Sequence, residues 1–479
     1  MTVTPFRKQH FQTYRDLYQS LTSSWQRFCE TKEAQILSFS LEIQPTDPLN
    51  LLHLLAPKNC VSFYFEKRDN NTELVNAKSE IAIAAIGAAL QKTFVGRDRF
   101  TAAKQFIQET LAHTQILGSA HLPNAGPHFF CGFRFFSEDE SAEFKTILFL
   151  PEWQISYQEN HCVAVANIVI DDRFSIEKTY EKIRRTLQKI HNTKSELVKP
   201  IVCQPPPFQM MDVTSSRHFQ AAVDEVLQTI ASGQLDKVVL AHAVDVRSPL
   251  PFHPVDCLQN LRSLYPGCYL FAINSGAGKV FLGASPERLV SLQQGHLLTD
   301  ALAGSAPRGG TPCEDAQLAD RLLSSVKELH EHEVVRDFIL QQLQQLGISP
   351  TRSPLRLRQL PNIQHLHTPI HAPVSASLHL LDVVAQLHPT PAVAGLPCAI
   401  ACEQIRRYEG FDRSLYAAPI GWVDHQGNGE FVVGIRSAMI EGCHARLFAG
   451  AGIVKGSAPE KEWAEVRLKM QALLRALAV

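Results

Sequence analysis

The amino-acid sequence predicts an α+β fold, and three observations support this prediction. Short apolar or alternating runs typical of strands recur along the chain, and amphipathic stretches typical of helices lie among them. The two kinds of segment are mixed and do not alternate strictly, as they would in a doubly wound parallel sheet. A short polar turn at 424–429, between two apolar runs, is typical of an antiparallel hairpin.

In the N-terminal part of the chain, two strands and one helix are expected. The aromatic-rich runs 61–65 and 129–136 predict strands, and 179–192 has the apolar spacing of an amphipathic helix. The chain must then be extended around Pro205–Pro207, because each proline lacks a backbone N–H and restricts the residue before it. We therefore place the main internal boundary near residue 205, and the residues before it carry no motif to which a reaction can be assigned.

After the proline triplet, the alternation of helix and strand patterns is clearer. Apolar residues recur at helical spacing from Phe219 to Ile230, Gly233 ends this helix, and a strand begins at Lys237. The same patterns predict further strands and long helices: strands at 269–274, 280–283, 431–436 and 446–449, and helices at 316–346 and 459–477. The segment 350–373 is rich in proline and histidine, which predicts a loop.

The composition is that of a globular protein with little net charge. Of its 479 residues, 45% are hydrophobic, and 46 Lys and Arg residues against 47 Asp and Glu residues give a formal net charge of -1. This balance disfavours binding to nucleic acid or to an anionic membrane surface. The longest apolar stretch, 81–90, is well short of the ~20 residues needed to cross a bilayer, so no membrane span is expected.

The cysteines and the N-terminal residues predict a reducing compartment. The 11 cysteines form no CxxC pair and no dense framework, so we expect reduced thiols. The first residues lack the apolar core of a secretory signal, and Arg7 and Lys8 favour a transit peptide only weakly. A cytoplasmic enzyme is therefore the expectation.

Two pairs of glutamates on predicted helices are candidate ligands for a divalent cation. Glu328 and Glu331 lie three residues apart in one helix, and Glu462 and Glu465 repeat this spacing in another, so each pair projects from one helix face. Carboxylate oxygens suit a hard ion such as Mg²⁺, which proteins hold with a few carboxylates, waters and an anionic substrate. For either pair alone, a solvated helix face is the more ordinary explanation.

Three other residues are candidates because of the segments around them. Glu287 follows an apolar strand and a proline, and a partly buried carboxyl there would have a raised pKa and could act as a general acid. Lys237 opens a strand and would need a lowered pKa to take a proton from water. His388 is fixed in an extended turn by neighbouring prolines. An exposed turn carboxylate, a surface lysine and a structural histidine are the ordinary explanations for these three residues.

Taken in order along the chain, these segments resemble the chorismate-utilising enzymes, the family of isochorismate, salicylate, anthranilate and aminodeoxychorismate synthases. The motifs that carry the resemblance are DKVVLA at 236–241, LGASPE at 282–287, LAGS at 302–305, HEHE at 330–333, LHPTPA at 387–392, YAAPIGW at 416–422, FAGAGIV at 448–454 and EWAE at 462–465. They span about 216–469, and their conjunction in one order is far more specific than any single motif.

The resemblance implies one α+β body in which two large antiparallel sheets pack face to face, with helices outside and the site in a cleft between them. Residues 1–205 would belong to this body, and residues 212–472 would form the chorismate-binding catalytic region. Lys237 would be the base that activates water, in a dry cleft with positive charge nearby, and Glu287 would be the acid.

The resemblance also implies a set of ligands for Mg²⁺ and for the substrate. Mg²⁺ would be held by Glu331 and Glu465, with Glu328 and Glu462 nearby or acting through water. The residues that would bind or border chorismate are Gly304, Ser305, His388, Tyr416, Arg436, Gly452 and Lys469.

Within this family, the incoming nucleophile decides the reaction. Lys237 resembles the lysine of the members that use water, so no glutamine amidotransferase subunit is expected. Ala303 stands where aminodeoxychorismate synthases carry a lysine nucleophile. The chain is most similar to the isochorismate synthases, which reversibly add water at C2 of chorismate and lose the C4 hydroxyl, feeding menaquinone, phylloquinone, siderophore or salicylate biosynthesis. A salicylate synthase, which goes on to eliminate pyruvate, and an inactive chorismate-binding homologue stay open as alternatives.

Overall fold

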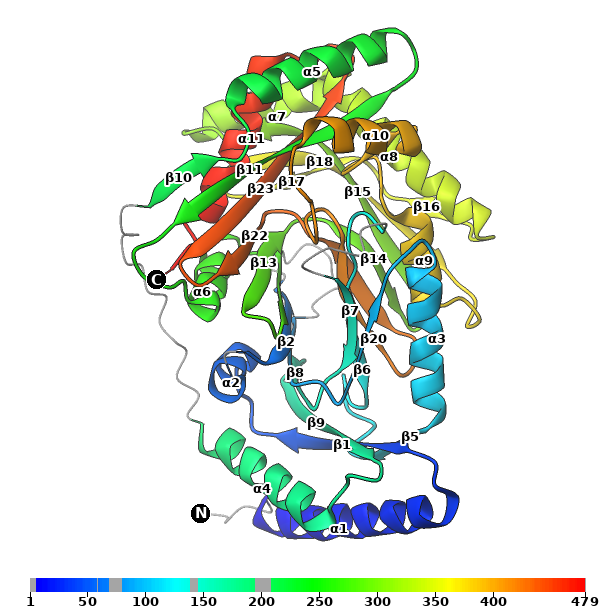
Figure 1. The fold of residues 1–479 in the computed structure, drawn as a ribbon. Coiled ribbons are helices and arrows are strands. Elements are labelled where there is room, and N and C mark those ends of the chain that lie inside the picture. Colours follow the sequence, from blue (N-terminus) through cyan, green and yellow to red (C-terminus); the bar gives the residue numbers. More distant parts are fainter. Residues whose placement is uncertain (1–5, 58, 69–79, 138–144, 194–207, 479) are drawn as a thin grey trace.

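The computed structural model describes residues 6–57, 59–68, 80–137, 145–193 and 208–478 of the chain. Within these residues, thirteen strands form one sheet and ten form a second, while helices lie on the outside (Figure 1). This arrangement is the α+β fold with two large sheets that was predicted. The proline-rich boundary near residue 205 lies outside the described residues.

The first sheet combines strands from both ends of the sequence. Its order is β10 (Gln209–Asp212), β11 (Lys237–Arg247), β23 (His444–Val454), β22 (Ser437–Glu441), β13 (Lys279–Ser285), β12 (Tyr269–Ser275), β2 (Val61–Lys67), β3 (Ile81–Ile86), β8 (Trp153–Gln158), β9 (His161–Ile170), β1 (Gln35–Ile43) and β5 (Thr114–Gly118), with β19 (Gly395–Leu396) beside β11. Among the described strand pairs, β1 and β5 run parallel and the others are antiparallel. Because β12 pairs with β2, the N-terminal strands continue the same sheet as the C-terminal ones.

The second sheet is also shared between the two parts of the chain. Its order is β16 (Thr351–Arg352), β18 (Ile363–Pro373), β15 (His296–Pro307), β14 (Arg288–Gln293), β21 (Gly429–Val433), β20 (Pro419–Asp424), β6 (His128–Gly132), β7 (Thr146–Leu150) and β4 (Leu90–Phe94), with β17 (Arg356–Gln359) beside β18. The predicted hairpin is confirmed, because β20 and β21 pair antiparallel with Val423 opposite Gly429.

Helices connect the strands and cover the sheets. Their bounds are α1 (Phe6–Thr31), α2 (Pro48–Leu55), α3 (Arg99–Ala112), α4 (Ile176–Asn192), α5 (Ser216–Ala231), α6 (Pro254–Leu264), α7 (Pro312–Ser324), α8 (Val326–Gln345), α9 (Leu380–Leu387), α10 (Cys398–Tyr408) and α11 (Pro459–Leu474). Serine caps start two of the predicted helices, since Ser175 and Ser215 accept hydrogen bonds from backbone N–H groups of α4 and α5. No helix in the described part of the chain is both long and apolar enough to cross a membrane.

The core lies between the sheets and is rich in aromatic rings. Phe63 on β2 meets Phe130 on β6 with ring centroids 5.0 Å apart, and both side chains are buried. Gly132 on β6 lies in the same layer, where an added Cβ would be 2.7 Å from the Cδ1 atom of Ile273 on β12 and that side chain would have to move. The sheets therefore pack face to face, and burial of such rings is the main driving force for this packing.

Two predicted elements are wrong. The single helix expected at 316–346 is two helices, because Ser325 is extended and its Oγ accepts a hydrogen bond from Glu328 N to start α8. The loop expected at 350–373 contains the long strand β18, which pairs along its whole length with β15. Polar side chains of this strand form hydrogen bonds inside the fold. For example, His367 Nε2 lies 2.9 Å from Asp300 Oδ1. The strand therefore lacks the apolar pattern by which strands are predicted.

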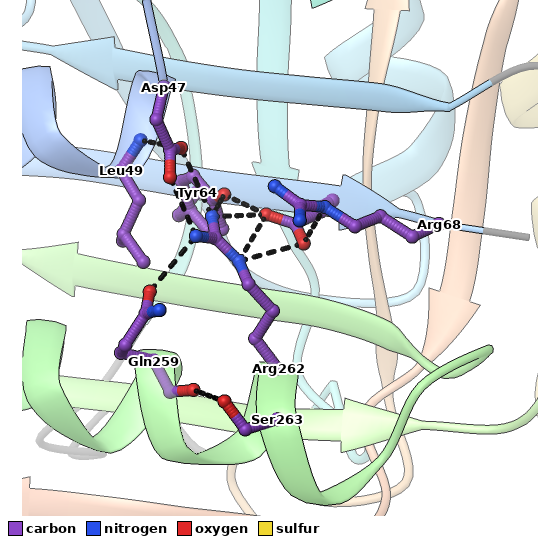
Figure 2. Close-up of polar contacts among 8 residues, drawn as sticks. Asp47, Leu49, Tyr64, Arg68, Gln259, Arg262 and Ser263 are labelled. Atoms are coloured by element: carbon purple, nitrogen blue, oxygen red, sulfur yellow. Dashed lines mark hydrogen bonds and ion pairs between the residues drawn. The ribbon is translucent and has the colours of Figure 1, made fainter. Parts of the chain in front are cut away.

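Arg262 on α6 joins the two parts of the chain through a buried polar network (Figure 2). Its guanidinium donates to Asp47 Oδ2 at 2.6 Å, to Glu66 Oε2 at 2.6 Å, to the Tyr64 hydroxyl at 2.8 Å and to Gln259 Oε1 at 2.9 Å. The Arg262 and Glu66 side chains are only 7% and 2% exposed. The guanidinium therefore compensates two carboxylates that water can barely reach.

We expect Arg262→Met to lower the free energy of unfolding by about 3–5 kcal/mol, because it leaves buried carboxylates without their cation. Urea denaturation followed by circular dichroism measures this loss. Arg68→Ala is the matched control, since Arg68 contacts the same Glu66 at 2.8 Å but is 41% exposed, and it should cost no more than about 1 kcal/mol. Similar losses for the two variants would contradict the role given to Arg262.

Candidate functional site

A cavity lies where the two sheets meet helices α8 and α11. It holds about 690 Å³ of empty space, including the part that is open to solvent. The predicted site residues that line it are Glu287, Gly304, Ser305, Glu331, Tyr416, Arg436, Gly452, Glu465 and Lys469. The structure thus brings together residues that are far apart in the sequence.

Lys237, the first residue of β11, lies directly behind this lining. Its side chain is fully buried, and its Nζ atom is 2.9 Å from Glu331 Oε1. The contact is an ion pair without hydrogen-bond geometry, and Nζ has no hydrogen-bond partner among the described residues. The sequence predicted dry surroundings with a positive charge near Lys237. The surroundings are dry, but the charged group that contacts Lys237 is the carboxylate of Glu331. Gly452 makes this approach possible, because a Cβ there would lie 2.1 Å from Glu331 Oε1.

Glu287 faces the cavity from the turn between β13 and β14. It is 4% exposed, and its backbone N–H donates to Ser285 Oγ at 3.2 Å. Burial raises the pKa of Glu287 to about 8, against the opposing effect of the Lys237 charge. With this pKa the carboxyl is mostly protonated at neutral pH. The upward shift of the pKa agrees with the sequence-based prediction for a buried carboxyl at this turn.

The four candidate metal ligands come from two neighbouring helices. Glu328 and Glu331 lie on α8, and Glu462 and Glu465 lie on α11. Burial raises the pKa of Glu328 and of Glu462. A neighbouring carboxylate adds a smaller increase in each case, Glu331 for Glu328 and Glu465 for Glu462. The carboxylates are thus close enough to repel one another, although Glu328 and Glu462 do not line the cavity.

Lysines compensate these carboxylates in the structure. Lys327 lies 2.8 Å from Glu462 Oε1 and 3.3 Å from Glu328 Oε1, and Lys469 lies 2.6 Å from Glu465 Oε1. Among the described residues, no three His, Cys, Asp or Glu side chains already converge on one point that could hold a metal ion. The donor set has the hard oxygen chemistry that Mg²⁺ prefers, but its oxygens are directed at ammonium groups.

Arg436 is the buried cation of the cavity. It is 7% exposed, its backbone has a φ of 51°, and in the described part of the chain no carboxylate lies within ion-pair distance of it. Burial lowers the pKa of this guanidinium, which stays charged at neutral pH. A left-handed backbone at a non-glycine residue is a strained conformation that is typical of functional sites.

His365 on β18 is a cavity residue that sequence reasoning missed. Its Nδ1 lies 2.9 Å from Ser305 Oγ, and its Nε2 lies 3.2 Å from Arg436 Nη2. Burial and the Arg436 charge hold the pKa of His365 well below its usual value. We therefore assign a neutral ring whose Nε2 accepts from Arg436 while Nδ1–H donates to Ser305. No sequence signal distinguished it from the other histidines.

His388, expected beside the substrate ring, does not line the cavity. Its ring packs edge-on against Phe135, with centroids 5.5 Å apart, and close to Phe100. Burial lowers the pKa of His388 to about 3, so its ring is neutral. His365 is the histidine that lines the cavity, and a role for His388 beside the substrate ring stays a prediction.

A family model for chorismate binding enzymes matches residues 22–478. The chain is 32% identical over 455 residues to the salicylate biosynthesis isochorismate synthase of Pseudomonas aeruginosa, covering 92% of this chain and 90% of that protein. It is 30% identical over 473 residues to the isochorismate synthase MenF of Bacillus subtilis, covering 94% of each.

A solved structure shows the same architecture. MenF, the menaquinone-specific isochorismate synthase from Escherichia coli, matches with a TM-score of 0.74 and 26% identity, over 96% of this chain and all of that one. The sequence match over nearly the full length, the shared fold and the cavity at the junction of the two sheets agree with one another. The chain therefore belongs to the chorismate-binding enzyme family.

Proposed function

We propose that this chain is an isochorismate synthase, which reversibly converts chorismate to isochorismate. The observation that carries the proposal is the placement of a buried carboxyl, Glu287, whose pKa is raised, and a buried lysine, Lys237, at one cavity. Adding water at one carbon while a hydroxyl leaves another requires both a base and an acid. Relatives named isochorismate synthases, aligned over nine-tenths or more of their length, support the same reaction.

The proposed mechanism moves one proton at each end of the substrate. Lys237 pairs with Glu331 as an ammonium in this structure, so it would first have to give up that proton. The resulting amine would take a proton from water while the water oxygen bonds to C2 of the ring. Glu287 gives its proton to the C4 hydroxyl, which leaves as water as the ring double bonds shift. Burial of both side chains excludes competing solvent and strengthens the electrostatic interactions in the cavity.

We further propose that Glu331 and Glu465 hold Mg²⁺, with Glu328 and Glu462 behind them. After burial, the charges of Glu331 and Glu465 help to raise the pKa values of Glu328 and Glu462. Negative charges gathered in this way favour a bound cation, which supports this assignment. A bound Mg²⁺ would supply positive charge for the ring carboxylate of the substrate. Lys327 and Lys469 would then lose part of their electrostatic role as partners of these glutamates.

The chain's own cations and hydroxyls would orient the substrate carboxylates. Arg436 offers a planar guanidinium without a carboxylate partner in the described structure, and Lys469 reaches the cavity from α11 while donating to Gly450 O at 2.8 Å. The Tyr416 hydroxyl and the Gly452 backbone N–H complete the set. Because water is the nucleophile in this proposal, no glutamine amidotransferase partner is required.

Incubation of the purified protein with chorismate, with and without Mg²⁺ or a chelator, tests the proposed reaction. We expect an equilibrium mixture of chorismate and isochorismate that forms only with Mg²⁺, resolved by chromatography. Salicylate with an equal amount of pyruvate would show a salicylate synthase. Absence of any product would favour an inactive chorismate-binding homologue.

The raised pKa of Glu287 predicts the alkaline side of the pH profile. A general acid works only when protonated, and the pH dependence of kcat/KM reports the free enzyme, so kcat/KM should fall as the pH rises through about 8. Glu287→Gln should lower kcat by about 10²–10⁴-fold and remove that limb. Glu441→Gln, at a carboxylate that is 58% exposed, is the control and should keep the wild-type profile. If the Glu287→Gln enzyme still loses activity as the pH rises through about 8, a group other than Glu287 causes this loss.

Gly452→Ala tests the close approach of Lys237 and Glu331. The new Cβ would lie 2.1 Å from Glu331 Oε1 and 3.1 Å from Lys237 Cε, so the carboxylate must move. We expect kcat to fall by about 10²-fold with an unchanged circular dichroism spectrum, because displacement by about 1 Å is costly in a preorganised site. Gly310→Ala, whose Cβ would meet its nearest atom at 3.5 Å, should leave kcat unchanged.

A further inference from the structure

Two cysteines lie in contact at the start of α10, outside the cavity. Cys398 is the first residue of this helix and Cys402 lies one turn later, and their sulfur atoms are 3.9 Å apart. Both residues are free thiols and are partly exposed, so a small reagent can reach them. The proposed reaction uses neither of them.

The surroundings favour a thiolate at Cys398. Its position in the first turn places it at the positive end of the helix dipole. A hydrogen bond from Cys402 lowers the pKa of Cys398 to about 7, and the same bond raises the pKa of Cys402. A large fraction of Cys398 is therefore the nucleophilic thiolate at neutral pH, with a protonated thiol beside it.

We propose that Cys398 and Cys402 form a redox-active dithiol that a hydroperoxide closes to a disulfide within α10. The Cys398 thiolate attacks the outer peroxide oxygen, which breaks the O–O bond, yields a sulfenic acid and releases an alkoxide that is protonated to the alcohol. The Cys402 thiol then attacks the sulfenic sulfur, forming the S–S bond and releasing water. Two thiols are oxidised and one peroxide is reduced.

Closing the disulfide must distort the first turn of α10. Side chains one turn apart on a helix have Cβ atoms about 5–6 Å apart, whereas a disulfide requires about 3.5–4.5 Å. This turn directly follows β19, where Leu396 pairs with Lys237 and accepts a hydrogen bond from Asp236 N at 2.9 Å. Tightening the turn would therefore pull on the backbone that positions Lys237.

The test is treatment of the reduced full-length protein with hydrogen peroxide, followed by proteolysis and mass spectrometry. We expect the peptide carrying Cys398 and Cys402 to lose about 2 Da and to recover this mass with dithiothreitol. Cys402→Ser should stop at a sulfenic acid on Cys398 that dimedone traps, and Cys398→Ser should react slowly. An intact dithiol after all other accessible thiols have reacted would overturn the proposal.

Cys313 provides the matched control. It also lies in the first turn of a helix, α7, and is exposed, but its sulfur accepts a hydrogen bond from the amide of Gln317 at 3.7 Å, and no second thiol contacts it in the described part of the chain. If Cys313 reacts with peroxide as fast as Cys398, the pairing of thiols confers no special reactivity and the proposal is wrong. Chorismate turnover measured before and after closure should fall about tenfold and recover on reduction. Unchanged turnover by a fully closed protein would overturn the link to Lys237.

Discussion

The ion pair between Arg413 and Glu409 is the buried interaction on which the geometry of the site depends. Both side chains are almost fully buried, with Arg413 Nε 2.8 Å from Glu409 Oε2. The guanidinium also donates to Val239 O at 2.9 Å and to Val393 O at 2.7 Å, and Glu409 Oε1 accepts from Ala241 N at 2.8 Å. The carbonyl of Val239 and the N–H of Ala241 on β11 thus form hydrogen bonds with the two charged side chains. These bonds satisfy buried backbone groups and also stabilise the buried charges.

This pair fixes two walls of the cavity relative to each other. Val239 and Val393 both line the cavity, and Lys237 lies on the same strand two residues before Val239. Because sheets and packed helices are close-packed, a shift of one wall would be transmitted to the other. The acid Glu287 approaches from a different turn, between β13 and β14, so the base and the acid are held by separate rigid elements.

Much of the fold and of the site could be predicted from the sequence, because local patterns and ordered motifs carry that information. The strand at Lys237 and the turn at Glu287 are local features that apolar runs and a proline define. The break at Ser325 was missed because a capping hydrogen bond, not a change in hydrophobicity, ends one helix and starts the next. His365 and His388 could not be told apart, since a ring that reaches a cavity and a ring packed on Phe135 differ only in tertiary contacts.

Under the proposed function, the charges around the cavity favour Arg436 as the place where an anionic substrate would be held. Lys237 is compensated by Glu331, and Lys469 by Glu465. Arg436 instead donates a hydrogen bond to the neutral ring of His365, and no carboxylate lies within ion-pair distance of it in the described structure. Burying a guanidinium that has no ion-pair partner destabilises the folded state, because one neutral hydrogen-bond acceptor replaces only part of the lost hydration. A carboxylate of the substrate would be the ion-pair partner that Arg436 lacks in the free protein. Binding would then offset the free energy lost when this charge is buried. The left-handed backbone of Arg436 adds strain at the same residue, and strain of this kind is typical of residues that serve a function.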